Sequence, residues 1–296
     1  MVLVAALAQT LRNAAQRELV QTVGTLAATF ARLVYGLPFA AAWLVAVLLW
    51  YRAALPAAGA GFVGWIFLGA VANVAGTALL LSAMTRRNFL VAVAYGKTEI
   101  LMVALFSMLL IGEVVGPVTA AAMLLATASV LLLSMQGGRA GLRSLLAAAA
   151  SATGWMGIGS GAAFAVAIVS YRAAALELGG GLPFVVVGAF GMACAQLMQS
   201  VLLGAYLAAR RREVLRQALR STWMAHAAGM LGAVATIGWL TAVSVRSASD
   251  VRTLALVEVL FSYVISRRLF KERLRGLELT GIVLLVVSLG VLSSQL

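Results

Sequence analysis

The sequence contains few acidic residues, one cysteine and one histidine, and each shortage excludes a class of protein. Only 9 of the 296 residues are Asp or Glu, against 22 Lys and Arg. A single cysteine, Cys194, excludes a disulfide within the chain, and a single histidine, His226, leaves no Cys/His metal cluster. Charged residues make up 10% of the chain, whereas a soluble domain has about 25%. The chain therefore does not have the composition of a soluble, disulfide-bonded or zinc-binding protein.

Hydrophobic residues, in contrast, make up 63% of the chain. They form runs of about 20 residues without strict alternation, which is typical of membrane-spanning helices. The excess of basic residues lies in short segments between these runs. We therefore expect an all-α integral membrane protein whose basic loops face anionic lipid, and we expect no binding to nucleic acid.

Ten segments are apolar and long enough to span a membrane. They cover residues 2–21, 24–49, 61–84, 88–111, 115–135, 151–170, 183–209, 222–244, 250–266 and 276–294. A glycine-rich segment, 137–141, separates the first five from the last five. The sequence thus predicts two five-helix units, residues 1–138 and 139–296.

The two units contain a repeat at a fixed spacing in the sequence. Residues 81–134 align without a gap on residues 240–293, so that Glu99 falls on Glu258 and Glu113 on Glu272. Because the alignment has no gap, every aligned pair is separated by the same number of residues as Glu99 and Glu258. This constant spacing is called the repeat offset below. Because five is an odd number, the second unit must enter the membrane from the opposite side. The expected fold is therefore ten helices in two inverted five-helix repeats, an architecture typical of secondary transporters.

The basic residues predict the orientation of the chain. One set of loops holds 15 of them: Arg17, Arg86, Arg87, Arg139, Arg143, Arg210, Arg211, Arg212, Arg216, Arg220, Arg267, Arg268, Lys271, Arg273 and Arg275. The other set holds 4: Arg52, Arg172, Arg246 and Arg252. The positive-inside rule places the first set in the cytoplasm and both termini outside.

Four short stretches resemble the EamA type of the drug/metabolite transporter superfamily, over essentially the whole chain. They are residues 9–14 with Gln16; residues 28–32 continuing to 35–40; Gly112-Glu113; and Lys271-Glu272-Arg273. The resemblance implies a ten-helix inverted-repeat carrier, usually an exporter of amino acids, metabolites or drugs. The chain departs from the family in having Gly96-Lys97-Thr98-Glu99 where many members have proline, and in the orientation that its loop charges predict.

The first span carries a polar stripe. Gln9, Arg12, Asn13 and Gln16 share one helical face by their spacing. An arginine facing lipid costs about 3 kcal/mol on insertion scales. We therefore expect Arg12, Asn13 and Gln16 to line a substrate site; the alternative is an Arg12 that snorkels to the interface.

The fourth span carries Tyr95, Lys97 and Glu99, and the ninth carries Glu258. Tyr95 and Lys97 are candidate substrate-binding residues. Glu99 and Glu258 are candidates for proton coupling, because a buried carboxylate can take up and release a proton during transport. Structural ion pairing is the alternative for both. Glu258 is the stronger candidate, because its sequence neighbours are apolar.

Three further residues complete the candidate site. Arg32 could bind a substrate carboxylate or lock a helix, while Tyr35 and Trp239 could form walls. Polar pairs at Asn73/Thr77 and Gln196/Gln199 could line the cavity or bond helix to helix. Glu113 and Glu272 precede the fifth and tenth spans, where we expect them to cap helix N-termini.

The sequence predicts a secondary active exporter of small polar metabolites such as amino acids, in a cell membrane such as the inner membrane of a bacterium. The expected partners are a small-molecule substrate, lipids and protons, with no cofactor or metal and with the chain as monomer or homodimer. The alternatives are a proton-coupled multidrug exporter, a lipid flippase and a non-transporting scaffold. No catalytic motif favours an enzyme.

Overall fold

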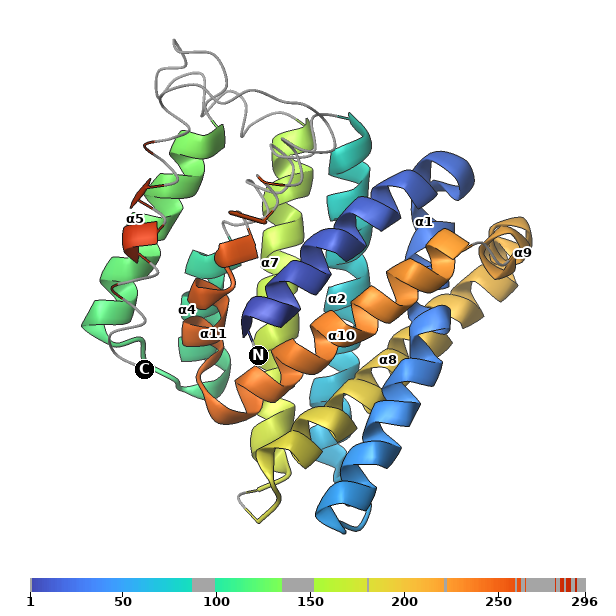
Figure 1. The fold of residues 1–296 in the computed structure, drawn as a ribbon, viewed down its shortest axis with the longest axis horizontal. Coiled ribbons are helices and arrows are strands. Elements are labelled where there is room, and N and C mark those ends of the chain that lie inside the picture. The colour runs from blue at the N-terminus through green and yellow to red at the C-terminus, as the bar shows by residue number, and fades with distance from the viewer. Residues whose placement is uncertain are drawn as a thin grey trace.

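A computed structural model of the chain is all-helical in the part that it describes (Figure 1). The described residues are 2–86, 99–134, 152–179, 181–220, 223–258, 260, 261, 264, 280, 283, 284, 286–288 and 291. Nine helices have bounds within them: α1 Val2–Tyr51, α2 Ala60–Arg86, α4 Glu99–Ile111, α5 Pro117–Ser134, α7 Ala152–Glu177, α8 Phe184–Arg210, α9 Arg212–Leu219, α10 Trp223–Val245 and α11 Ala248–Leu254.

Five of these helices, α1, α2, α7, α8 and α10, are long and apolar enough to cross a membrane. Two shorter apolar helices, α4 and α5, lie beside them. Helices satisfy their own backbone hydrogen bonds, so they can lie in lipid where no water is available. The composition and length of these helices together indicate a membrane protein.

Helix α1 contains both of the first two predicted spans. It bends at Gly24, whose φ of 78° and ψ of 168° are not helical. Glycine tolerates a positive φ because it has no Cβ, so the chain can change direction here without a loop. The dark-blue first arm of α1 then lies along α10 (Figure 1).

Small residues allow the helices to approach closely. A Cβ added to Gly229 of α10 would lie 2.7 Å from the backbone carbon of Tyr35, and one added to Gly76 of α2 would lie 2.9 Å from the ring of Phe164. The most extensive contacts in the described chain are accordingly α1 with α10 and α2 with α7. Packing of this kind stabilises helix pairs in lipid, where the hydrophobic effect between helices is weak.

Two predicted spans differ from the observed helices. Helix α7 continues to Glu177, seven residues beyond the predicted end at 170, so Tyr171 and Arg172 lie within it. The predicted span 250–266 is interrupted, because α11 ends at Leu254 and the amides of Leu256 and Glu258 donate to Thr253 and Ala255, three residues back. Glu258 thus lies where the helical hydrogen-bonding pattern changes. Most of the predicted span 276–294 is outside the described residues.

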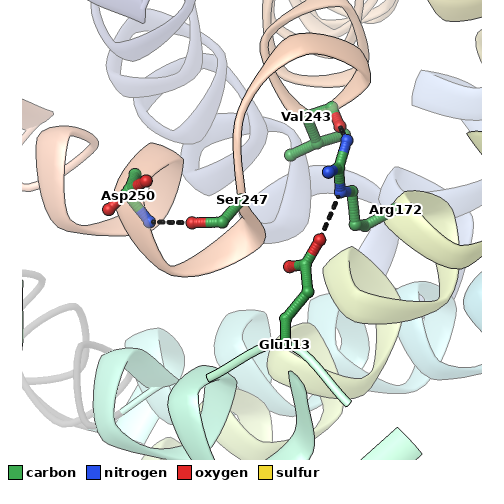
Figure 2. A network of polar contacts seen from close by, with 5 residues as sticks. All are labelled: Glu113, Arg172, Val243, Ser247 and Asp250. Carbon is green, nitrogen blue, oxygen red and sulfur yellow. Dashed lines mark hydrogen bonds and ion pairs between the residues drawn. The ribbon is translucent and has the colours of Figure 1, made fainter. Parts of the chain in front are cut away.

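The prediction that Glu113 caps a helix N-terminus is wrong. Helix α5 begins at Pro117, and Glu113 lies in the link that precedes it. Its Oε1 instead accepts a hydrogen bond from Nε of Arg172 at 2.8 Å, and Nη1 of Arg172 donates to the carbonyl of Val243 at 2.9 Å (Figure 2). The carboxylate is therefore used to connect the α4–α5 link, α7 and the end of α10. Glu272 lies outside the described residues.

The short helix α9 is amphipathic. It buries Ala218, with Val214 and Leu215, against α1 and α8. Its arginines, Arg212 and Arg216, are exposed. The apolar face of α9 is therefore turned toward the protein, and its arginines are turned away from it.

Candidate functional site

A cavity lies among helices α1, α2, α4, α7, α8 and α10. Its empty volume is about 860 Å³, counting the part open to solvent. It is lined by Gln9, Arg12, Asn13, Arg32, Asn73, Thr77, Leu80, Glu99, Phe164, Ile168, Tyr171, Gln196, Gln199, Thr236, Trp239, Leu240 and Glu258. Helices from both predicted units contribute to it, and most of the lining residues are polar.

The carboxylate of Glu258, which lines the cavity, accepts hydrogen bonds from two side-chain amides. Nε2 of Gln9 donates to Oε2 at 2.9 Å, and Nδ2 of Asn13 donates to Oε1 at 3.2 Å. The side chain of Glu258 is buried, with 1% of its surface exposed. Both donors come from the first arm of α1, so this buried acidic group connects α1 to the segment that follows α11.

The two amides are themselves oriented by other groups. The indole Nε1 of Trp239 donates to Oε1 of Gln9 at 2.7 Å. Nε and Nη2 of Arg12 donate to Oδ1 of Asn13 at 3.3 and 2.8 Å. Because an amide oxygen that accepts a hydrogen bond fixes the position of its NH₂, Trp239 and Arg12 direct both NH₂ groups toward Glu258.

Arg32, on the second arm of α1, is also buried, with 3% of its surface exposed. Its Nε and Nη2 have no hydrogen-bond partner among the described residues. The stems of Arg32 and Arg12 meet over Gly232, where an added Cβ would lie 3.3 Å from Cγ of Arg32 and 3.4 Å from Cδ of Arg12. The absence of a side chain at Gly232 thus gives two cations room in one cavity.

Neutral polar side chains from α7 and α8 complete the cavity near Arg32. Tyr171 is close enough to Arg32 to interact with it electrostatically. The Tyr171 hydroxyl accepts a hydrogen bond from Nε2 of Gln199 at 3.0 Å. Gln196 donates from Nε2 to the carbonyl of Leu33 at 2.8 Å, one residue beyond Arg32. All three side chains are buried.

Ten of the 17 lining residues form pairs that are separated by the repeat offset, the same spacing that relates Glu99 to Glu258. Five pairs have this spacing: Gln9/Ile168, Arg12/Tyr171, Thr77/Thr236, Leu80/Trp239 and Glu99/Glu258. The two threonines even make the same hydrogen bond, each donating to the carbonyl four residues before it, at 2.9 Å for Thr77 and 2.8 Å for Thr236. These ten lining residues therefore come from both predicted units, five from each.

The structure brings together six of the ten residues that the sequence predicted for the site. Those that line the cavity are Arg12, Asn13, Arg32, Trp239, Glu99 and Glu258. Gln16 is buried but does not line the cavity. Tyr35 lies away from it, where its hydroxyl donates to the carbonyl of Leu219 and its ring contacts the ring of His226. The other two, Tyr95 and Lys97, lie outside the described residues.

Sequence reasoning missed Tyr171 because its predicted span ended one residue earlier. It left open whether Asn73, Thr77, Gln196 and Gln199 line a cavity or join helices; all four line the cavity. The repeat itself could have identified Tyr171, since the repeat offset relates it to Arg12. In the described part of the chain, no three His, Cys, Asp or Glu side chains form a group that could hold a metal ion.

Comparison with known proteins adds evidence about the fold alone. No protein-family model and no curated protein matches the chain. A solved structure called "Crystal structure of protein" is similar to it with a TM-score of 0.66 at 16% identity, covering 99% of this chain and 96% of the other. The chain therefore shares the fold of a solved protein over almost its whole length.

Proposed function

We propose that the chain is a secondary active transporter of small polar metabolites such as amino acids, and that it belongs to the EamA type of the drug/metabolite transporter superfamily. The observation that carries this proposal is the set of five residue pairs, each related by the repeat offset, around one polar cavity. In transporters built from inverted repeats, the substrate site lies where the two repeats meet.

The contacts between helices support an inverted repeat of ten helices. If residues 1–138 and 139–296 are equivalent units, the first arm of α1 corresponds to α7, and α2 corresponds to α10. The contact of α1 with α10 then corresponds to the contact of α7 with α2, and these are the two most extensive contacts in the described chain. Rocking of one unit against the other would open the cavity to each side in turn.

The charges in the cavity favour a substrate that carries both signs. Glu258 and Glu99 offer carboxylates that could meet an ammonium group, and Arg12 and Arg32 offer cations that could meet a carboxylate. A buried charge is costly unless it is paired, and Nε and Nη2 of Arg32 have no hydrogen-bond partner among the described residues, so a purely apolar drug would leave this cation without compensation. A zwitterion such as an amino acid offers a carboxylate to Arg32 and an ammonium group to a carboxylate of the cavity.

Reconstitution into liposomes tests this proposal. Liposomes preloaded with a mixture of unlabelled amino acids should accumulate at least one labelled amino acid by exchange, and protein-free liposomes should not. Failure across the full set of amino acids, with the protein folded and inserted, would contradict the proposed substrate class. Accumulation of hydrophobic cations alone would favour a multidrug exporter.

A further inference from the structure

The two arginines of the cavity differ in how the same edge of the guanidinium is used. In Arg12, Nε and Nη2 both donate to Oδ1 of Asn13, at 3.3 and 2.8 Å. In Arg32, the same two atoms, Nε and Nη2, have no partner among the described residues. Nε–H and Nη2–H lie side by side and point in one direction, which matches the two oxygens of a carboxylate.

We propose that Arg32, assisted by the Tyr171 hydroxyl, is the subsite for the substrate carboxylate, and that Arg12 is a positioning residue for the Glu258 subsite. This division of roles rests on the proposed function, which treats both arginines alike. Arg12 acts through Asn13, whose NH₂ donates to Glu258. Arg32 acts on the substrate directly.

Burial and hydrogen bonding support the assignment of Arg32. Its side chain is 3% exposed and lines the cavity, so the unpartnered edge cannot be hydrated as it would be at a surface. An uncompensated buried cation is costly, whereas a carboxylate in bidentate contact offsets much of that cost. The site is therefore suited to bind an anion that arrives with the substrate.

Tyr171 supplies a further donor beside Arg32. Because its oxygen already accepts a hydrogen bond from Gln199 at 3.0 Å, its own O–H is left to donate. Tyr171 is also near enough to Arg32 to interact with it electrostatically. A carboxylate could receive two N–H donors and one O–H donor here.

Among the described residues, only the first of the two predicted units supplies arginines to this subsite. The position that corresponds to Arg32 in the second unit is Gly191, and the position that corresponds to Arg12 is Tyr171. Both cations that line the cavity in the described chain therefore come from the first unit, and Gly191 has no side chain with which to form an equivalent carboxylate subsite. We expect a substrate with one carboxylate to bind better than one with two.

Acetate and acetamide test the subsite without knowledge of the substrate, because they share a shape and differ in charge. The measurement is the Tm of the detergent-solubilised full chain, titrated with sodium acetate, with acetamide, or with sodium chloride as the control for ionic strength. Acetate should raise the Tm of the wild type above the chloride control, and acetamide should not. A ligand that binds only the folded state raises stability in this way.

Three variants assign the effect to a residue. Arg32→Gln should weaken the apparent affinity for acetate about tenfold or more, because charge-assisted hydrogen bonds are lost. Tyr171→Phe should weaken it about fivefold, through loss of one neutral hydrogen bond. Arg12→Gln is the comparison variant and should weaken it less than Arg32→Gln does, because Arg12 acts on the bound acetate only through its nearby charge. If Arg32→Gln does not fold, Tyr171→Phe and Arg32→Lys give the test, since lysine keeps the charge and loses the bidentate edge.

The outcomes are distinct. Acetate stabilisation that is absent from the wild type, or that survives in Arg32→Gln, would overturn the subsite. Acetate stabilisation lost in Arg12→Gln and kept in Arg32→Gln would reverse the two roles. Exchange of amino acids in liposomes with no acetate effect would leave the transport function standing without this subsite, whereas an acetate effect without any exchange would contradict the function alone.

Discussion

Arg172 on α7 donates from Nε to Oε1 of Glu113 at 2.8 Å and from Nη1 to the carbonyl of Val243 at 2.9 Å. One side chain thereby connects the α4–α5 link to the end of α10 (Figure 2). The side chains of Arg172 and Glu113 are 15% and 23% exposed, so the ion pair is largely shielded from water. Removal of either partner leaves a charge that is poorly hydrated.

We expect Arg172→Met and Glu113→Gln each to destabilise the protein by about 2 kcal/mol, with a coupling energy of about 1 kcal/mol or more between them. The free energies of unfolding of the two single variants and the double variant would be compared by reversible unfolding in mixed detergent. The pair Arg216–Glu213, whose side chains are 75% and 76% exposed, is the control and should give a coupling close to zero. Additive effects at Arg172 and Glu113 would mean that the ion pair does not hold these segments together.

Two glycines on α8 allow a matched test of helix packing. A Cβ added to Gly188 would lie 2.8 Å from the backbone Cα of Thr241 on α10, whereas one added to Gly191 would meet nothing within 4 Å. Gly188→Ala should therefore cost about 1–3 kcal/mol, because backbone cannot yield as a flexible side chain can. Gly191→Ala should be neutral or stabilising by up to about 1 kcal/mol, through helix propensity. Equal effects in the same unfolding assay would contradict close packing of α8 on α10.

The sequence was sufficient to predict elements whose ends are marked by a change in polarity. Helices α8 and α10 begin and end within one residue of the predicted spans, because arginine and glycine-proline segments flank apolar runs. Helix α7 was predicted too short because an arginine after an apolar run indicates a loop. Arg172 instead lies within the helix, where it is paired with Glu113. Local pattern alone cannot reveal a partner 59 residues away.

The sequence was sufficient to predict several residues that line the candidate site, but it did not predict the hydrogen bonds between them. The polar stripe identified Arg12, the repeat identified Glu258, and Arg32 was a candidate as a charge within an apolar run, since such charges must face protein or water. The bond from Gln9 to Glu258 joins residues 249 positions apart, so helical periodicity could not assign it. For the same reason, the different use of Arg12 and Arg32 emerged only from the folded arrangement.

A stability test separates a binding role for Arg32 from a structural one. If Arg32 awaits a ligand anion, Arg32→Met removes an uncompensated buried charge, and the Tm in acetate-free detergent should rise by a few degrees, on the order of 1 kcal/mol. If Arg32 holds helices together, the same change should lower the Tm. Arg12→Met is the control and should lower it, because Asn13 would lose the donors that orient it.

The last prediction concerns the two carboxylates that the repeat relates. Glu258 accepts hydrogen bonds from Gln9 and Asn13, and Arg12 donates to Asn13, whereas Glu99 is the first residue of α4 and lines the same cavity as Arg32. Since their surroundings differ, we expect the two to have different roles and Glu258 to be the proton or amine site. Glu258→Gln should abolish transport driven by a pH gradient in liposomes while substrate exchange at equal pH persists, because exchange needs no net movement of protons. Glu99→Gln, the matched change at the corresponding position, should keep the response to the pH gradient. Normal pH-gradient-driven transport in Glu258→Gln, together with its loss in Glu99→Gln, would assign the proton to Glu99, and an unchanged response in both variants would exclude coupling through this pair.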